Sequence, residues 1–413
     1  MLPKHTRGPR TGTGAEDLPS GSHDNASAAR SIKNESLPSG SLRDLKPRSE
    51  RLKILHLVVR LGAPNTQYNE HCLPLITKRD ISICAFFREA SLVPPPEIAL
   101  FDGGGTVRGF MRALNAGLRA RQFDVVHAHA PQTGFLLALR NLLALRSMAN
   151  TIYTVHNCFN NYSVRNQLLL YPVFLAFPRI TVCSRSVLES LPRALRLLAR
   201  SKITIVSNSV DTERVDRALA DMERPVADDR FRVVSVSRLI ERKDPITLME
   251  AFALASLPDA TLTYVGDGEL ATALAEHGDA LGLEKRITFT GMVARDDVYR
   301  YAAEADLYMS TSKGEGLPVA VLEAMACGCP VVLSDIAPHR EIAEDTDFIP
   351  LIPPQDTAGF ARAIELFHAM SSDERSAVGR RCREVVEDRF SLWAMHRSYG
   401  AIYEEIEDRV RPG

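Results

Sequence analysis

The sequence lacks the features that mark membrane-spanning, disulfide-stabilised and nucleic-acid-binding proteins. It has no run of roughly 18 apolar residues, and the apolar stretch 168–177 is too short and contains Pro172, so we expect no transmembrane helix. The seven cysteines are odd in number and lack paired CxxC spacing, which favours reduced thiols in a cytoplasmic chain. A formal net charge of −1 disfavours binding to nucleic acid through bulk charge.

The first 50 residues differ from the rest of the chain. They are rich in Ser, Gly, Pro and charged residues and have almost no aliphatic clusters, so burial cannot offset the entropy cost of ordering them. We therefore predict a disordered tail over 1–50. This tail has basic residues but no apolar segment of the kind found in secretory signals, so secretion is not expected.

Beyond the tail, short apolar runs alternate with longer amphipathic stretches. Such runs are typical of strands buried on both faces of a parallel sheet, joined by crossover helices. The first set of expected strands is 52–59, 81–87, 124–129, 151–155, 179–183 and 203–206. The second set is 231–237, 260–265, 286–290, 306–310, 330–334 and 347–352. The predicted fold class is α/β, with two Rossmann-like halves.

The two sets of strands also suggest domain boundaries. We predict an N-terminal domain at 51–211, a linker at 212–230 that holds a helix and a connection, and a C-terminal domain at 231–390. The final segment, 391–413, has the aromatic and aliphatic spacing of an amphipathic helix. At 45% hydrophobic residues, the chain can fill the cores that these domains need.

Two glutamates eight residues apart stand out in the second set. Pro318 suits the first position of a helix and Gly328 the residue that ends it, so Glu315 precedes this helix and Glu323 lies within it. The free N–H groups at a helix start form an anion site, and Gly316 would let a ligand approach the backbone closely. A phosphate would fit there, with a carboxylate on either side to accept hydroxyl groups.

Spacing alone is a weak argument, because glutamate is common on helices. Glu323 nevertheless lies in an almost wholly apolar helix, where an unpaired carboxylate is costly, so it requires a partner. Arg238 and Lys243 follow the strand 231–237 and are close enough to hold one diphosphate, although in isolation they would be ordinary surface cations. Glu241 and Arg242, which lie between them, are expected at the surface.

The stretch EGLPVAVLEAMACGCPVV at 315–332 resembles the donor-site signature of glycosyltransferase family 4. Six further segments match in family order, namely DVVHAH, TVHN, SNSVD, VSRLIERKDPITLMEAF, YVGDGEL and ITFTGMV. The resemblance covers most of 52–400. It implies the GT-B architecture of two Rossmann-like domains facing across a cleft, with the last helix crossing back to the first domain. It also implies that the sugar is transferred from a nucleotide diphosphate with retained configuration.

The resemblance assigns roles to individual residues. Arg238 and Lys243 match the cations that hold the donor diphosphate. Glu315 would contact hydroxyls of the transferred sugar, and Glu323 the ribose. His156, in TVHN, would face the transferred sugar. We expect His156, Glu315, Arg238 and Lys243 to be catalytic. The remaining expected donor-binding residues are Gly62, Gly266, Gly268, Met292, Val293, Gly316, Leu317, Pro318 and Val319.

Some segments depart from the family pattern. Family members usually carry a Gly-Gly pair in the loop after the first strand, whereas here only Gly62 remains and the bulkier polar segment 65–70 follows. This loop could mark an unusual acceptor, or weaken activity. Asn208 stands in Ser-Asn-Ser where the family usually has Pro-Asn-Gly. His127 and His129 either line the acceptor side or pack locally, and packing is favoured for His127.

We expect no metal or other cofactor besides the nucleotide sugar as co-substrate. The Asp-Thr-Asp triplet at 345–347 resembles the cation-binding signature of the other major glycosyltransferase fold, but it falls in a predicted surface turn. Arg238, Lys243 and the helix start would supply the positive charge instead.

The predicted function is transfer of a hexose from a UDP- or GDP-sugar to a lipid-linked or polysaccharide acceptor in cell-surface glycan synthesis. A nucleotide-sugar epimerase of the same architecture and an inactive nucleotide-sugar-binding protein are the alternatives. The segment 191–203 mixes arginines with leucines and is either an ordinary packed helix or a basic amphipathic surface. We expect a cytoplasmic protein with peripheral contact at the inner membrane face and no nucleic acid partner.

Overall fold

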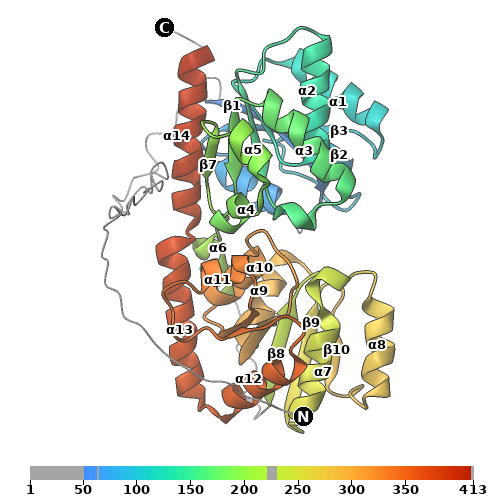
Figure 1. Cartoon of the computed structure of the whole chain (residues 1–413), viewed down its shortest axis with the longest axis vertical. Coiled ribbons are helices and arrows are strands. Elements are labelled where there is room, and N and C mark those ends of the chain that lie inside the picture. Colours follow the sequence, from blue (N-terminus) through green and yellow to red (C-terminus); the bar gives the residue numbers. More distant parts are fainter. Residues whose placement is uncertain (1–50, 63–64, 221–229, 411–413) are drawn as a thin grey trace, which may run out of the picture. The chain divides into compact units, whose positions relative to one another are not determined.

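A computed structural model describes residues 51–62, 65–220 and 230–410. The predicted tail at 1–50 and most of the predicted connection after residue 220 lie outside the described residues. Two parallel sheets with helices between successive strands make up the described part of the chain (Figure 1). This arrangement confirms the α/β fold class.

The first sheet has seven parallel strands in the order β3-β2-β1-β4-β5-β6-β7. Its strands are β1 Lys53–Leu61, β2 Asp80–Arg88, β3 Ala99–Asp102, β4 Val125–Ala128, β5 Thr151–Val155, β6 Arg179–Val182 and β7 Ile203–Ile205. Helices α1 Val107–Ala120, α2 Pro131–Leu143, α3 Val164–Ala176, α4 Arg185–Ser190 and α5 Arg193–Leu198 connect them. A π-helix, η3 Gln67–Cys72, and a short 3₁₀ turn, η4 Leu73–Leu75, follow β1.

The second sheet has six parallel strands in the order β10-β9-β8-β11-β12-β13. They are β8 Phe231–Val236, β9 Ala260–Val265, β10 Ile287–Phe289, β11 Leu307–Ser310, β12 Val331–Ser334 and β13 Leu351–Ile352. The helices of this half are α7 Pro245–Ala255, α8 Ala271–Ala280, α9 Arg295–Glu304, α10 Val319–Ala326, α11 Ala337–Ile342, α12 Thr357–Ala369 and α13 Ser372–Arg389. Two short 3₁₀ turns also belong to the described residues and lie close to the sites discussed below. They are η5 Phe159–Asn161 and η6 Glu241–Lys243.

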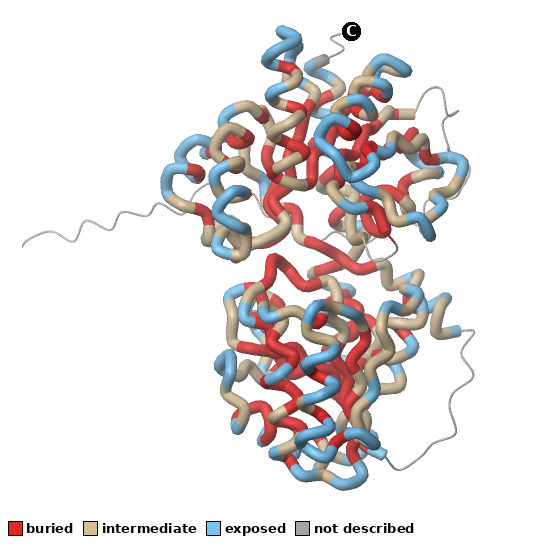
Figure 2. Tube along the Cα trace, turned by 90° about the vertical axis from the view of Figure 1, so that its right-hand side faces the viewer, coloured by how far each residue is buried: buried red, intermediate tan, exposed pale blue. Residues whose placement is uncertain are grey.

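All twelve predicted strands overlap strands of the structure, and β3 is the one strand of the described residues that the sequence did not predict. The central strands are buried on both faces, as the tube coloured by burial shows (Figure 2), which is why their sequences read as continuous apolar runs. β3 has four residues, none of them buried, at the edge of the first sheet. It therefore lacks the apolar run on which the prediction depended.

Two helices remain among the described elements. α6 Thr212–Ala220 occupies the start of the predicted linker, and α14 Leu392–Val410 occupies the predicted final helix. α14 lies against the first sheet, because the Tyr403 hydroxyl is 2.8 Å from Nδ1 of His127 on β4. Tyr399, one turn earlier, lies 3.2 Å from the hydroxyl of Thr154 on β5.

The start of α10 differs by one residue from the prediction. Pro318 has extended backbone angles and is the N-cap, so the first helical residue is Val319. Gly328 has φ +74° just past the helix end, a left-handed conformation that glycine adopts without a Cβ penalty. Glu315 therefore precedes the helix and Glu323 lies one turn into it, as expected.

Candidate functional site

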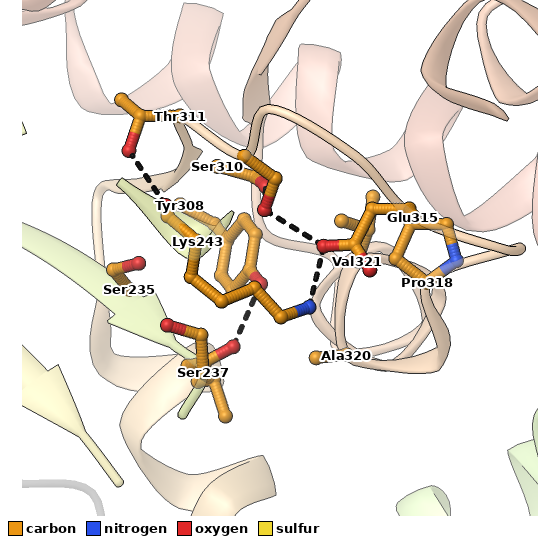
Figure 3. Close-up of a pocket in the computed structure, with 12 residues that line it drawn as sticks. Ser235, Ser237, Lys243, Tyr308, Ser310, Thr311, Glu315, Pro318, Ala320 and Val321 are labelled. Atoms are coloured by element: carbon orange, nitrogen blue, oxygen red, sulfur yellow. Dashed lines mark hydrogen bonds and ion pairs between the residues drawn. The ribbon is translucent and has the colours of Figure 1, made fainter. Parts of the chain in front are cut away.

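An ion pair between Lys243 and Glu315 lies at the carboxyl ends of β8 and β11. Lys243, at the end of η6, donates a hydrogen bond of 2.5 Å to Oε1 of Glu315. Figure 3 shows the pair in a pocket whose wall includes Ser235 and Tyr308. Ligands of open α/β sheets bind at this end of the strands.

Glu315 is buried and held as a carboxylate. Burial alone would raise the pKa of this carboxyl, but the charge and hydrogen bond of Lys243 outweigh burial, and the pKa lies below its ordinary value. Ser312 also donates to Oε1 at 2.7 Å. The carbonyl of Ser312 in turn accepts a hydrogen bond from Ser334, which His339 contacts at 2.8 Å. The carboxylate is therefore fixed in position before any ligand arrives.

Arg238 and Arg242 flank this pair. The Arg238 side chain makes no hydrogen bond or ion pair with the residues that the structure describes, and it is exposed. Arg242 was predicted to lie on the surface, but it is half-buried and donates to the carbonyl of Asn161 at 3.3 Å. The prediction failed because Arg242 meets a segment about 80 residues earlier in the chain. Of the described cations around this pair, Arg238 is therefore the one left available to an anionic ligand.

Three side chains of the first half donate hydrogen bonds to three successive backbone carbonyls in the loop between β11 and α10. Asn161 donates to the carbonyl of Glu315 at 2.9 Å, and Ser184 donates to that of Gly316 at 3.2 Å. Asn208 donates to the carbonyl of Leu317 at 2.8 Å. The asparagine of the Ser-Asn-Ser segment therefore positions the loop that carries Glu315.

Gly316 is required by contact with the first half. A Cβ atom at Gly316 would lie 2.1 Å from the carbonyl oxygen of His156, far inside van der Waals contact. Gly266 and Gly268 behave similarly, since Cβ atoms there would lie 2.1 and 2.3 Å from the carbonyl oxygens of Ser237 and Leu239. In each case the close approach is to protein backbone, whereas for Gly316 the sequence suggested approach of a ligand.

Glu323 has the partner that its apolar helix requires, and that partner is Arg295. The guanidinium of Arg295 at the start of α9 forms ion pairs with Glu323 and, at 2.5 Å, with Glu70 of η3. The Tyr299 hydroxyl is 3.4 Å from the same oxygen of Glu323. The exposed fractions of the Arg295, Glu70 and Glu323 side chains are only 10%, 3% and 9%. Sequence reasoning missed Arg295 and Glu70, although it had marked the loop that contains Glu70 as unusual.

The comparisons with known proteins agree with this geometry. Residues 59–214 match the sequence model described as Glycosyltransferase Family 4, and residues 217–385 match the one described as Glycosyl transferases group 1. Together the two matches cover most of the chain. The chain belongs to glycosyltransferase family 4.

Two relatives of this glycosyltransferase are bacterial enzymes. The UDP-Gal:alpha-D-GlcNAc-diphosphoundecaprenol alpha-1,3-galactosyltransferase of Escherichia coli is 24% identical over 80% of this chain and 87% of its own. The lipopolysaccharide core biosynthesis glycosyltransferase LpsE of Rhizobium meliloti is 32% identical over 55% of this chain and 66% of its own.

The solved structures show which fold the glycosyltransferase has. Anabaena Alr3699/HepE in complex with UDP and glucose superposes with a TM-score of 0.69 at 18% identity, covering 86% of this chain and 100% of that chain. The fold is GT-B, as the resemblance implied. At this identity the comparison concerns the fold alone.

The other predicted donor residues of the glycosyltransferase differ in their relation to this pocket. Pro318 lines the pocket together with Ala320 and Val321 of α10, whereas Leu317 is buried against the core. Val293 packs against that core, and Met292 is exposed. The predicted roles of these residues remain predictions.

The described residues of the loop after β1 make close and polar contacts. Gly62 is buried, and a Cβ atom there would overlap the carboxyl group of Glu89. Asn65 accepts a hydrogen bond of 2.7 Å from the backbone N–H of Tyr68, which fixes the start of η3. The loop therefore places Glu70 against Arg295 instead of leaving a glycine-rich opening.

His156 directly follows β5 and contacts a series of further imidazoles. Its Nε2 lies 3.0 Å from Nδ1 of His129, whose Nε2 lies 2.9 Å from Nδ1 of His56. Burial lowers the pKa of His156 to about 4 and that of His56 to about 3, so both rings are neutral at neutral pH. His127 is buried and bonded to Thr154 and Tyr403, in accord with the packing role favoured for it.

The Asp-Thr-Asp triplet at 345–347 lies away from this site. Asp345 has φ +60° in a surface turn, and Asp347 pairs with Arg381 at 2.6 Å. Both aspartates are exposed. The triplet thus lies in the surface turn that the sequence predicted.

Proposed function

We propose that this glycosyltransferase moves a hexose from a nucleotide diphosphate sugar to a hydroxyl acceptor with retention of the anomeric configuration. The observation that carries the proposal is the buried Lys243–Glu315 ion pair, with the exposed Arg238 nearby. An anion entering this pocket would meet one cation already positioned and another that lacks a partner among the described residues. The carboxylate would meet hydroxyl groups next to that anion.

Donor binding would break the Lys243–Glu315 ion pair and give each side chain a new partner on the donor. The diphosphate would accept hydrogen bonds from Lys243 and Arg238, and the N–H groups at the start of α10 would add a partial positive charge. Glu315 would then accept hydrogen bonds from the sugar. Because Ser312 also holds Glu315, the carboxylate would keep its position when Lys243 turns to the phosphate.

The reaction would proceed at the front face of the sugar. The bond from the anomeric carbon to the diphosphate oxygen breaks, and its electron pair stays on the diphosphate. The acceptor hydroxyl oxygen attacks from the same side and forms the new bond, while its proton passes to the leaving phosphate. Lys243 and Arg238 would stabilise the charge that develops on the diphosphate, which makes a divalent cation unnecessary for this step.

Glu323 would bind the ribose, with Arg295 fixing its side-chain rotamer. The carboxylate of Glu323 already contacts Arg295, so ribose recognition would use a side chain that is positioned in advance. His156 would present its neutral imidazole to the transferred sugar, while the contact with His129 fixes the orientation of the ring. We place UDP ahead of GDP because the structural neighbour was solved with UDP and glucose.

We further propose a lipid-linked acceptor reached at a membrane surface. The name of the E. coli relative specifies a diphosphoundecaprenol substrate. Residues 103–202 of this chain contain 13 Arg and Lys against two acidic residues, although the whole chain has a net charge of −1. Such a segment would be attracted to anionic lipids. Within the described ranges, no helix combines the length and apolarity needed to cross a bilayer.

Exposed leucines accompany these arginines. α3 packs against both α2 and α5. On these helices Leu143, Leu168 and Leu197 are 77%, 64% and 72% exposed, and Leu145 just after α2 is 92% exposed. Leucines next to arginines suit insertion at the headgroup boundary. Peripheral contact with the membrane is therefore the part of the proposal that rests on α2, α3 and α5.

The proposal is tested by transfer from radiolabelled UDP- and GDP-hexoses to lipid extracts of bacterial membranes. We expect one donor to label the lipid and NMR of the product to show the anomeric configuration of the donor. Glu315→Gln should lower the rate by roughly 10²- to 10³-fold. Glu284→Gln should not lower it, because Glu284 is exposed and does not line the pocket. An inverted product would contradict retention, and undiminished transfer by Glu315→Gln would remove the site assignment.

A further inference from the structure

Five histidines gather in the first half of the protein. His56 lies on β1, His127 lies beside it on β4 in direct register, and His129 follows on the same face of the sheet. His71 of η3 covers these rings, and His156 adjoins His129. Neighbouring ring centroids are 3.9 to 6.5 Å apart. The reaction proposed above uses only His156.

The hydrogen bonds of this histidine cluster leave two ring nitrogens without partners. His56 uses Nδ1 on His129, and His127 uses both nitrogens on the hydroxyls of Tyr403 and Thr154. Among the described residues, Nε2 of His56 and Nε2 of His71 have no partner, although both are buried. Buried polar atoms normally find a partner, so these two nitrogens are open to a ligand.

We propose that His56, His127 and His129 bind a transition-metal ion of the Zn²⁺ class. One ring nitrogen of each of the three side chains lies within 4.8 Å of one from each of the others. Zn²⁺ binds imidazole nitrogen at about 2.0–2.1 Å, so two tetrahedral ligands are separated by roughly 3.4 Å. Binding would replace the present contact between Nδ1 of His56 and Nε2 of His129, which are 2.9 Å apart.

His71 is placed to complete the coordination. Its ring centroid lies 5.2 Å from that of His129 and 6.0 Å from that of His127. Binding through Nε2 would give this orphaned nitrogen a partner. The fourth ligand would therefore come from η3, the π-helix that follows the unusual loop after β1.

The surrounding groups fit the outer shell of such a site. A histidine that binds metal through one nitrogen usually donates the N–H of the other to an acceptor, which fixes its tautomer. His127 can turn one nitrogen to the ion and keep a hydroxyl of Thr154 or Tyr403 on the other. His129 can bind the ion and donate to His156. An ion would thus orient His156 through one intervening ring.

The ligand set selects the kind of ion. Neutral imidazoles suit Zn²⁺, Ni²⁺ and Cu²⁺, whereas Mg²⁺ and Ca²⁺ prefer carboxylate and carbonyl oxygens, which the three proposed ligands do not offer. This site is distinct from the Lys243–Glu315 pocket, so it does not depend on the proposed transferase reaction. The proposed ion would act on the first half of the protein, and the diphosphate would still be held by cationic side chains.

The test uses the full chain, stripped with chelator and titrated with Zn²⁺ alone. We expect one tightly bound Zn²⁺ and an X-ray absorption spectrum that shows at least three imidazole ligands. His56→Gln should weaken Zn²⁺ affinity by at least the roughly 10- to 100-fold that loss of a second-shell partner costs. His277→Gln, on α8 of the other half, should bind as the wild type does.

Two results would overturn the proposal. One is a wild-type protein that retains no Zn²⁺ after dialysis, which would leave the cluster as hydrogen-bonded packing. The other is a bound ion whose spectrum shows mainly oxygen ligands or fewer than three imidazoles. Because the spectrum is recorded on the wild type, it decides the question even if His56→Gln fails to fold. A folded His56→Gln variant with unchanged affinity would exclude His56 as a ligand.

Discussion

Arg295 lies between two buried carboxylates, and this arrangement makes the stability of the protein depend on pH. One guanidinium pairs with both Glu70 and Glu323, so the three side chains carry one uncompensated negative charge when both carboxyls are ionised. Burial, opposed by Arg295 and reinforced by Glu323, raises the pKa of Glu70 from 4.5 to about 7. The protonated form of Glu70 is therefore favoured in the folded state.

The direction in which pH changes the stability follows from the difference between the folded and unfolded pKa of Glu70. Since the folded pKa of Glu70 lies above the unfolded one, its contribution to stability is fully present below about pH 4.5 and is lost as the pH rises through about 7. The loss amounts to about 3 kcal/mol, on the order of 1.4 kcal/mol for each pKa unit. We predict that Glu70→Gln removes this loss, as measured by urea unfolding from about pH 5 to about pH 8.

The exposed Glu276 offers a matched control. Glu276→Gln should reproduce the wild-type change of unfolding free energy with pH. Parallel curves for the wild type and Glu70→Gln would show that Glu70 does not hold the proton in the folded state. The difference between the two curves isolates Glu70, because every other titrating group is present in both proteins.

The residues of the candidate site could be predicted only in part. Glu315 and Lys243 could be named because each follows a strand and belongs to an extended motif. The need of Glu323 for a partner also followed from its apolar helix. Arg295 and Glu70 could not be named as the partners, since they are about 225 residues apart in sequence and meet only when the two halves fold. The burial of Arg242 was missed for the same reason.

At the scale of elements, the turn before α10 depends on the absence of a side chain at residue 316. A Cβ there would overlap the carbonyl of His156, whereas a Cβ at Gly328, after the same helix, would meet nothing within 4 Å. We predict that Gly316→Ala shifts the loop that carries Glu315, costs about 1–3 kcal/mol through overpacking and abolishes most transfer. Urea unfolding and the transfer rate measure the two effects.

Gly328→Ala is a control for this prediction, because it strains the backbone without bringing the new Cβ against another residue. Gly328 has φ +74°, so alanine should cost about 1 kcal/mol through conformation alone and leave the transfer rate near the wild-type value. A Gly316→Ala variant as active as Gly328→Ala would mean that the loop does not need its contact with His156.

The order of strands and helices could be predicted from the sequence more fully than the residues at which each element begins and ends. Apolar runs identified the buried strands because parallel strands are covered on both faces. β3 escaped because it is a short edge strand with no buried residue. The start of α10 was placed one residue early because Pro318 fits both the N-cap and the first helical position in sequence, and only the backbone angles distinguish the two.

At the scale of the whole molecule, charge is distributed unevenly along the chain. With 13 basic and two acidic residues, 103–202 is strongly cationic, although the chain as a whole carries a net charge of −1. We predict that the full chain sediments with vesicles that contain phosphatidylglycerol and not with phosphatidylcholine vesicles. Binding should weaken as salt rises, since the Debye length falls to about 3 Å at 1 M ionic strength.

Arg196 and Arg362 give a matched pair for this prediction. Both are exposed, Arg196 on α5 of the first half and Arg362 on α12 of the second. Arg196→Glu should reduce vesicle binding, and Arg362→Glu should leave it unchanged. Equal loss in the two variants would indicate that total charge, and not the cationic segment, governs association with lipid.

The central claim is that the Lys243–Glu315 pocket binds the diphosphate of the donor without a metal ion. Isothermal titration of the full chain with UDP, in excess chelator, tests it most directly. We predict that UDP binds the wild type and that Lys243→Ala weakens binding by about 10- to 100-fold, the value of a charge-assisted contact. Equal UDP affinity in the wild type and Lys243→Ala, or binding that appears only when a divalent cation is added, would contradict the account.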